Sequence, residues 1–228
     1  MCIVFSFCLY GPYSKKYYMG LIENIKIINK NYPEYYIYIS FGNDIDKSII
    51  KEIDKYKNII YKIYDFTGAK LMTYRYVPID LSNVSILFSR DVDSRINTRD
   101  MWCINEFIKS KYLIHIIRDH KNHNFPIMGG MVGFKKEFLK YITSFENIIR
   151  MTFNLNFKYL TDQIILAEYI YKKHIKEDIF LVHSKVNTFN EKNVIKIPLE
   201  VNKETFIGQV IDYDENNKKI YIYEYLEY

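Results

Sequence analysis

Two aspartates one residue apart follow an apolar segment in the first half of the chain. The segment Ile86-Leu87-Phe88 leads through Ser89-Arg90 into Asp91-Val92-Asp93. If the chain stays extended there, alternation sends both carboxylates to one face, where they repel each other unless a cation neutralises them. Mg²⁺ or Mn²⁺ held by one or two carboxylates can take its other ligands from substrate phosphates. The alternative is a solvated turn whose charge neighbouring arginines balance.

Alternating apolar strands and amphipathic helices are predicted to position these aspartates. The predicted strands are Cys2–Tyr10, Tyr35–Ser40, Asn58–Tyr64, Val84–Phe88, Tyr112–Ile117 and Ile179–His183. The predicted helices are Lys15–Lys30, Asp46–Lys57, Thr98–Lys109, Lys135–Ile149 and one that starts near Thr161. This order, β-α-β-α-β-β at first, indicates an α/β fold with a mainly parallel sheet flanked by helices. Ligands bind at the carboxyl ends of such strands, so Asp91 and Asp93 should meet Tyr10, Arg118 and His183 there.

Composition limits the class of protein. The 228 residues, 49% of them hydrophobic, can bury one sizeable core, and no linker is evident, so we expect a single domain over residues 1–228. The net charge of +5 is spread along the chain and forms no basic stripe, so we expect no nucleic-acid partner. It does suit an anionic ligand.

The cysteines and the N-terminal segment bear on location. Cys2, Cys8 and Cys103 form neither a disulfide framework nor a metal-like spacing, which favours a reducing compartment. The apolar start, Met1–Tyr10, lacks a basic flank and is too short to span a bilayer. We therefore expect a cytoplasmic protein without a membrane partner. The oligomeric state stays open, and a homo-oligomer is one of the alternatives.

Several other residues have both a functional and a structural interpretation. Arg75 could clamp a phosphate through two hydrogen bonds, or form a surface salt bridge. Gly129 and Gly130 could let a sugar approach the backbone, or form a turn that requires positive φ. His183 could be a ligand or a polar residue at a strand end. The histidines at 115, 120 and 123 lack the spacing of a four-ligand zinc site.

Asp162 also allows two interpretations. Thr161 is a good N-cap residue, so Asp162 in the first helical turn could simply complement the helix dipole. The other interpretation, a catalytic role, follows from the resemblance described below. The sequence does not choose between them.

Five motifs occur together in a characteristic order, and the similarity that they carry runs from the first strand to Phe206-Ile207-Gly208-Gln209-Val210. The motifs are Arg90-Asp91-Val92-Asp93-Ser94-Arg95, His115-Ile116-Ile117-Arg118-Asp119-His120, Pro126-Ile127-Met128-Gly129-Gly130-Met131-Val132-Gly133, Thr161-Asp162-Gln163 and Leu181-Val182-His183. In this order they resemble a GT-A-fold glycosyltransferase of the kind found in bacteria and large DNA viruses. The resemblance extends over most of the chain. If the protein is viral, it would act in the cytoplasm of the infected cell.

The resemblance implies a metal-dependent transfer of a sugar from a nucleotide-sugar donor, with UDP the preferred nucleotide. Mn²⁺ or Mg²⁺ would bind Asp93 directly, with Asp91 near the ribose or the metal and His183 as third ligand. Asp162 would lie beside the reacting sugar as base or as stabiliser of positive charge. The other expected donor-binding residues are Ser6, Leu9, Tyr10, Arg75, Arg90, Arg118, Asp119, Gly129 and Gly130. The acceptor, whether glycan, protein or small molecule, is not specified.

Two other functions fit parts of the sequence. A phosphatase with an aspartyl nucleophile also carries two aspartates after a strand, but usually at the end of the first strand and followed by Thr or Val. Here Ser94-Arg95 follows, late in the chain. A nucleic-acid-binding module would use the many aromatic residues for stacking, but most of these fall at core spacing.

Overall fold

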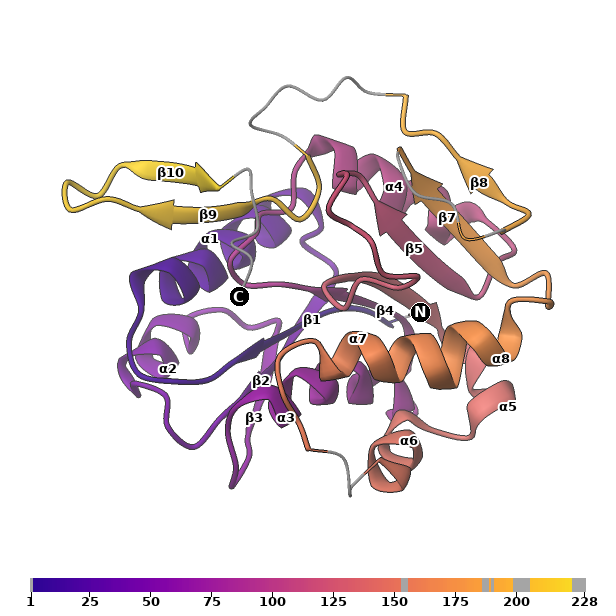
Figure 1. Cartoon of the computed structure of the whole chain (residues 1–228). Helices are drawn as coiled ribbons and strands as arrows, with labels where there is room; N and C mark the ends of the chain where they lie inside the picture. The colour runs from indigo at the N-terminus through magenta and orange to yellow at the C-terminus, as the bar shows by residue number, and fades with distance from the viewer. Residues whose placement is uncertain (1, 153–155, 186–188, 190, 199–205, 223–228) are drawn as a thin grey trace.

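The sheet sets the position of the predicted aspartates (Figure 1). The computed structural model describes residues 2–152, 156–185, 189, 191–198 and 206–222. Eight strands form one sheet in the order β3 (Ile59–Ile63), β2 (Tyr36–Phe41), β1 (Cys2–Leu9), β4 (Val84–Arg90), β6 (Met131–Lys135), β5 (Ile114–Arg118), β7 (Phe180–Ser184) and β8 (Val194–Ile195). Only β6 runs antiparallel to its neighbours, β4 and β5. The prediction of an α/β fold with a mainly parallel sheet is therefore confirmed.

Helices cover both faces of this sheet. One face packs against α1 (Lys15–Asn31), α2 (Ser48–Ile53) and α4 (Thr98–Lys109). The opposite face carries α3 (Ala69–Thr73), η1 (Tyr74–Asp80), η2 (Lys136–Phe138), α5 (Leu139–Ile142), α6 (Phe145–Met151), α7 (Thr161–Ile165), the π-helix η3 (Leu166–Tyr171) and α8 (Lys172–His174). The strands β9 (Val210–Tyr213) and β10 (Lys219–Ile222) form a hairpin beside α1.

Alternation along the central strands decides which side chains reach which face. On β1, Phe5 and Phe7 pack in the core under α1 and α4, whereas Cys8 faces Leu71 of α3. Burial raises the pKa of the Cys8 thiol to about 12, so this thiol stays protonated at neutral pH. All three cysteines are free. Among the described residues, no helix is both long enough and apolar enough to cross a membrane.

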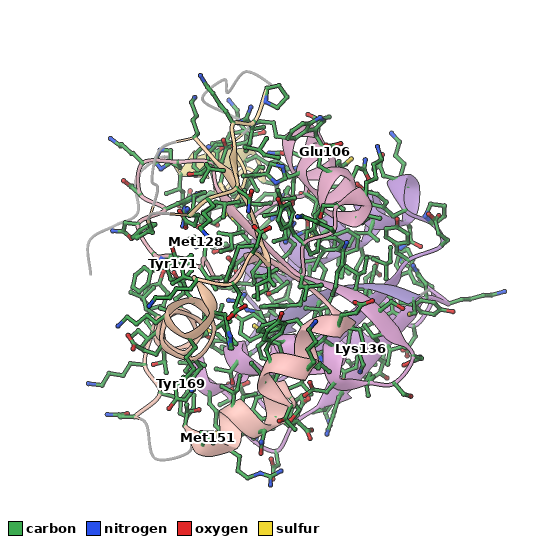
Figure 2. All side chains as sticks on the ribbon, turned by 90° about the vertical axis from the view of Figure 1, so that its right-hand side faces the viewer. Glu106, Met128, Lys136, Met151, Tyr169 and Tyr171 are labelled. Atoms are coloured by element: carbon green, nitrogen blue, oxygen red, sulfur yellow. The ribbon has the colours of Figure 1, made fainter. Side chains whose placement is uncertain are left out.

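The chain between β6 and α7 differs from the prediction. The expected helix Lys135–Ile149 is wrong, because Thr143 adopts φ 70° and interrupts it. Ser144 then caps α6 by accepting a hydrogen bond from the Asn147 N–H at 3.0 Å. Figure 2 shows Met151 at the far end of α6, where its side chain is 64% exposed. Lys136, labelled in the same view, donates hydrogen bonds to three carbonyls at the end of η1.

Further elements, β8 among them, were not predicted from the sequence. The helical segment α3–η1 lies between β3 and β4, where two consecutive strands are expected. Strand β6 and the hairpin β9–β10 were also absent from the prediction. The segment α3–η1 contributes residues to the candidate site described next, and two glycines of that site directly precede β6.

Candidate active site

Alternation along β4 divides its last residues between the two faces. Ser89 and the following Asp91 lie on the face covered by η1, where Asp91 contacts Arg75, and the Ser89 hydroxyl donates to the Gly129 carbonyl at 2.8 Å. Arg90 faces α4 instead. Its guanidinium donates to both carboxylate oxygens of Asp100, at 2.8 and 2.7 Å. The structure therefore places Arg90 in a buried ion pair rather than at the expected donor site.

Arg75 lies at the centre of the candidate site. Its side chain is 2% exposed, and its two terminal nitrogens contact two different carboxylates. Nη1 donates to Oδ1 of Asp91, and Nη2 donates to Oδ2 of Asp162 at 2.5 Å. The surface salt bridge considered from the sequence is excluded, because the pair with Asp162 is buried on both sides. Arg75 thus links Asp91, the first aspartate of the Asp91-Val92-Asp93 motif, to Asp162.

Asp162 is the most deeply buried carboxylate of the site, with a side chain that is 0% exposed. Its Oδ2 also accepts a hydrogen bond from the Tyr76 hydroxyl at 3.2 Å. Its Oδ1 is buried and has no hydrogen-bond partner among the residues that the structure describes. Thr161 is not the N-cap as expected: α7 starts at Thr161, and Leu160 before it adopts φ 71°. The Thr161 hydroxyl accepts from the Lys158 N–H instead.

Gly129 and Gly130 bring the backbone against these side chains. A Cβ on Gly129 would lie 2.2 Å from Oδ2 of Asp162 and 2.4 Å from Nη2 of Arg75. A Cβ on Gly130 would lie 1.9 Å from Oδ2 of Asp91. Neither glycine has a positive φ, so close approach rather than turn geometry requires glycine here.

Asp93 faces the same edge of the sheet. The segment turns after Asp91, and the Ser94 hydroxyl donates to the Asp91 carbonyl at 3.3 Å. Burial and the negative charge of Asp91 raise the pKa of Asp93, although Lys16 of α1 lies 3.4 Å from its Oδ2 and opposes that shift. The two carboxylates therefore repel each other, as the sequence predicts.

His183 lies away from these carboxylates. Strands β6 and β5 separate β4 from β7, and three strand spacings amount to roughly 14 Å. The His183 Nδ1 lies 2.8 Å from the His115 Nε2, with Trp102 against the ring. Within the described ranges, no three His, Cys, Asp or Glu side chains gather as metal ligands would. The structure does not bring His183 to the site as a third ligand.

Arg118 and Asp119 follow β5 and are engaged elsewhere. Arg118 is fully buried and donates to Oε1 of Glu191 at 2.7 Å. Asp119 accepts from the Arg99 Nε at 2.8 Å and from the Ile207 N–H at 3.0 Å. Asp119 thus connects α4 to the segment at Ile207, and neither Arg118 nor Asp119 contacts Arg75 in the described part of the chain.

Of the three predicted residues on β1, only Tyr10 lies at the open end. Ser6 and Leu9 are 0% and 2% exposed. Ser6 pairs with both β2 and β4, and Leu9 forms the last pair with β2. The backbone of both residues is therefore already part of the sheet. Tyr10 is half-buried, and its hydroxyl points to the Met72 sulfur at 3.7 Å.

The sequence analysis missed Ser89, Tyr76 and Lys16. Ser89 could have been found from alternation along β4, because it shares the face of Asp91. Tyr76 and Lys16 carry no local signal that separates them from the many other tyrosines and lysines in this chain.

Comparison with known proteins rests on structure alone. No family model and no curated protein matches the sequence. A glycosyltransferase involved in glycosylation of the major capsid of PBCV-1 has 14% identity and a TM-score of 0.54, covering 81% of this chain and 82% of that one. The TarS 1-349 fragment of S. aureus, in complex with UDP, has 14% identity and a TM-score of 0.57 over 82% of this chain. The chain has the GT-A glycosyltransferase fold.

The chain spans only part of the length of two of the proteins it matches. It covers 59% of the TarS 1-349 fragment. GlyE from Streptococcus pneumoniae TIGR4, a glycosyltransferase with 16% identity and a TM-score of 0.52, is covered over 44% of its length. The similarity in each case concerns the fold.

Proposed function

We propose that this protein is a metal-dependent glycosyltransferase that moves a sugar from a nucleotide-sugar donor to an acceptor. The observation that carries the proposal is the buried Arg75 guanidinium between Asp91 and Asp162. It places two functional groups side by side at the carboxyl edge of a GT-A sheet: an acidic motif able to hold a metal, and a carboxylate able to take a proton. Gly129 and Gly130 leave the backbone side of this site without side chains.

Asp91 and Asp93 are the residues that would hold Mn²⁺ or Mg²⁺. They fit such an ion because both ligands are hard carboxylate oxygens, and because the charge of Asp91 raises the pKa of Asp93 alongside burial. When bound, the metal would neutralise charge on the departing nucleoside diphosphate. The remaining ligands would come from the donor phosphates and water, since His183 does not join them.

Asp162 has the geometry of a proton acceptor or of an anionic group beside the reacting carbon. Arg75 and Tyr76 hold its Oδ2, which fixes the carboxylate in one orientation. Oδ1 is left without a described partner, and we assign to it the acceptor proton in an inverting transfer. In a retaining transfer, the same oxygen would stabilise positive charge on the sugar.

UDP is the preferred nucleotide of the donor. TarS 1-349 was solved in complex with UDP and, in another structure, with UDP-GlcNAc. The half-buried Tyr10 at the end of β1 lies on the same face as Cys8 and is our candidate for contact with the base or ribose.

The test is calorimetry with UDP and other nucleoside diphosphates, in Mn²⁺ and in EDTA. We expect binding that depends on Mn²⁺, and loss of that dependence in Asp93→Asn. A second assay follows the nucleoside diphosphate released by donor hydrolysis, which requires no knowledge of the acceptor. Equal affinity in EDTA and in Mn²⁺ would contradict the metal assignment.

The same preparation separates the two other functions. A phosphatase would release phosphate from a general phosphomonoester, and a nucleic-acid-binding module would be stabilised by single-stranded DNA in a thermal-shift assay. Either result without any response to nucleotide sugars would overturn the proposed transfer.

A further inference from the structure

The loop that carries Asp93 rests directly on helix α1. A Cβ on Gly20 would lie 1.9 Å from the Val92 carbonyl oxygen, so the loop contacts the helix at a position with no side chain. Asn24, 1% exposed, donates to the Ser94 carbonyl at 2.7 Å and accepts from the Ile96 N–H at 3.1 Å. Helix α1 therefore fixes the loop from one side.

Arg95 closes the loop on itself and connects it to two other elements. Its Nη1 donates to the Val92 and Ser94 carbonyls at 3.1 and 3.0 Å. Its Nε donates to Oε2 of Glu23 on α1 at 2.7 Å, and its Nη2 donates to the Tyr213 hydroxyl on β9 at 3.2 Å. The Arg95 side chain is 8% exposed, so these hydrogen bonds are largely shielded from water.

Tyr213 completes the cluster from the hairpin. Its hydroxyl donates to Oε1 of Glu23 at 2.9 Å, which closes a ring of hydrogen bonds among Glu23, Arg95 and Tyr213. Lys219 of β10 adds a contact to Oε2 of Glu23 at 2.8 Å. Burial opposes ionisation of Glu23, but its hydrogen bonds with Arg95, Lys219 and Tyr213 outweigh that effect and lower its pKa. Glu23 is therefore held as an anion.

The hairpin is also bonded to Asp93 itself. The Ile211 N–H donates to the Asp93 carbonyl at 2.8 Å, two residues before Tyr213 along β9. Figure 1 shows the hairpin, in yellow, beside α1. Asp93 is thus connected through its main chain to β9 and through the Glu23–Arg95–Tyr213 cluster to α1.

We propose that the hairpin β9–β10 positions Asp93 for metal binding, with Glu23, Arg95 and Tyr213 as positioning residues. The inference rests on the proposed role of Asp93. Two carboxylates that repel each other relax apart unless the backbone that carries them is restrained, and a metal tolerates only small errors in ligand position. Groups that orient a ligand typically change metal affinity about 10–100-fold when they are removed.

The experiment measures the affinity for Mn²⁺ from the free Mn²⁺ signal in electron paramagnetic resonance, with and without UDP. Its variants are Tyr213→Phe, Glu23→Gln and Arg95→Met, with Arg95→Lys as the charge-conserving substitution. We expect Arg95→Met to weaken Mn²⁺ binding about 10-fold, Tyr213→Phe and Glu23→Gln to weaken it less, and Arg95→Lys to restore part of it. Donor hydrolysis should show a raised KM for Mn²⁺ and a kcat close to wild type at saturating Mn²⁺.

Tyr171→Phe is the matched control. Tyr171 is labelled in Figure 2. Like the Tyr213 hydroxyl, its hydroxyl makes two hydrogen bonds, one to the Phe189 carbonyl at 2.8 Å and one to Oε1 of Glu191 at 2.9 Å. It belongs to η3 and touches no part of the loop at Asp93. We expect Tyr171→Phe to lower the melting temperature about as much as Tyr213→Phe does, and to leave the Mn²⁺ affinity unchanged. If Arg95→Met does not fold, the Mn²⁺ affinities of Tyr213→Phe and Glu23→Gln are compared with that of Tyr171→Phe instead.

The outcomes separate this inference from the proposed function. Wild-type affinity in all cluster variants, or an equal loss in Tyr171→Phe, overturns the positioning role. If in that case Asp93→Asn still abolishes binding, the metal assignment survives. A wild-type protein that binds no Mn²⁺ overturns both.

Discussion

Arg75 and Asp162 are 87 residues apart in the sequence, yet the Arg75 Nη2 lies 2.5 Å from Oδ2 of Asp162 with both side chains buried. A buried ion pair of this kind is costly to break, because the remaining partner keeps its charge without compensation. The same carboxylate is our candidate for the chemical step. Stability and turnover at Asp162 are therefore coupled, and experiments must measure both.

Asp162→Asn should lower donor hydrolysis by roughly 10²-fold or more, the scale of general acid–base catalysis. Because the pair is buried, the substitution should also reduce the free energy of unfolding by roughly 1.5–3 kcal/mol, more than the 0.3–1 kcal/mol of an exposed helix-dipole contact. Hydrolysis assays and urea unfolding measure the two effects. Asp100→Asn, in the buried Arg90–Asp100 pair, is the control and should lose stability while it retains turnover. Full hydrolytic activity in Asp162→Asn would remove Asp162 from the reaction.

Gly130→Ala should weaken Mn²⁺ binding by about 10-fold or more, because its Cβ would collide with Oδ2 of Asp91 and displace that carboxylate. Calorimetry with Mn²⁺ and UDP measures the change. Gly133→Ala, three residues further along the chain in β6, would instead press on the Phe88 ring at 2.9 Å. That control should lose stability with little change in Mn²⁺ affinity. Comparable Mn²⁺ affinities in the two variants would refute a specific requirement for glycine at 130.

Lys16→Gln should strengthen Mn²⁺ binding. The Lys16 ammonium lies 3.4 Å from Oδ2 of Asp93, so it competes with a metal cation for the same carboxylate. Without it we expect a Kd for Mn²⁺ that is lower by roughly 3–10-fold, which corresponds to about 1 kcal/mol for a partly exposed ion pair. Titrations at low and high salt would check that the effect is electrostatic. Weaker binding in the variant would show that Lys16 supports the metal site instead.

Stability should fall in acid because of the pair His115 and His183. Burial lowers the pKa of His183 to about 4, and that of His115 well below its ordinary range. Below about pH 6.5 these two imidazoles bind protons in the unfolded chain but stay neutral in the folded chain. The free energy of unfolding therefore decreases as the pH falls from 6.5 towards 4. For His183 alone the loss is about 3 kcal/mol.

Urea unfolding at a series of pH values tests this expectation. His183→Gln removes one of the two rings. Between pH 6.5 and 4 it should reduce the number of protons taken up on unfolding by about one, so the unfolding free energy depends less steeply on pH. His174, which is half-buried on α8, offers a control at which His174→Gln should leave most of the dependence intact. Identical slopes in wild type and His183→Gln would contradict the buried pair as a source of acid sensitivity.

The sequence predicted the sheet well because its strands are long apolar runs. The ladder of β1, β2 and β4 corresponds to three of those runs, and the predicted edge holds both Asp91 and Asp93. Helix prediction failed at Thr143, where a positive φ interrupts a periodic pattern that looked continuous. Local periodicity does not report such a break.

The candidate site was predictable only in part, because its contacts are between segments distant in the sequence. Asp91, Asp162, Arg75 and the two glycines do meet. Arg90 and Arg118 were misplaced because a sequence gives a charge but not the partner that neutralises it, here Asp100 and Glu191. His183 was misplaced because the insertion of antiparallel β6 moves β7 away from β4.

The position of β6 has a further consequence, which concerns the order of assembly. Gly129 and Gly130 directly precede β6 and lie against the site, β6 pairs with β4 across more than forty residues of chain, and α7, which carries Asp162, follows β6 in the sequence. Contacts of such long sequence separation are closed late, because their loop entropy must be overcome before they stabilise the chain. We therefore expect the contacts between Arg75, Asp91 and Asp162 to form after the sheet has started to assemble, so that a metal ion at the proposed site would bind a folded chain and would not nucleate folding.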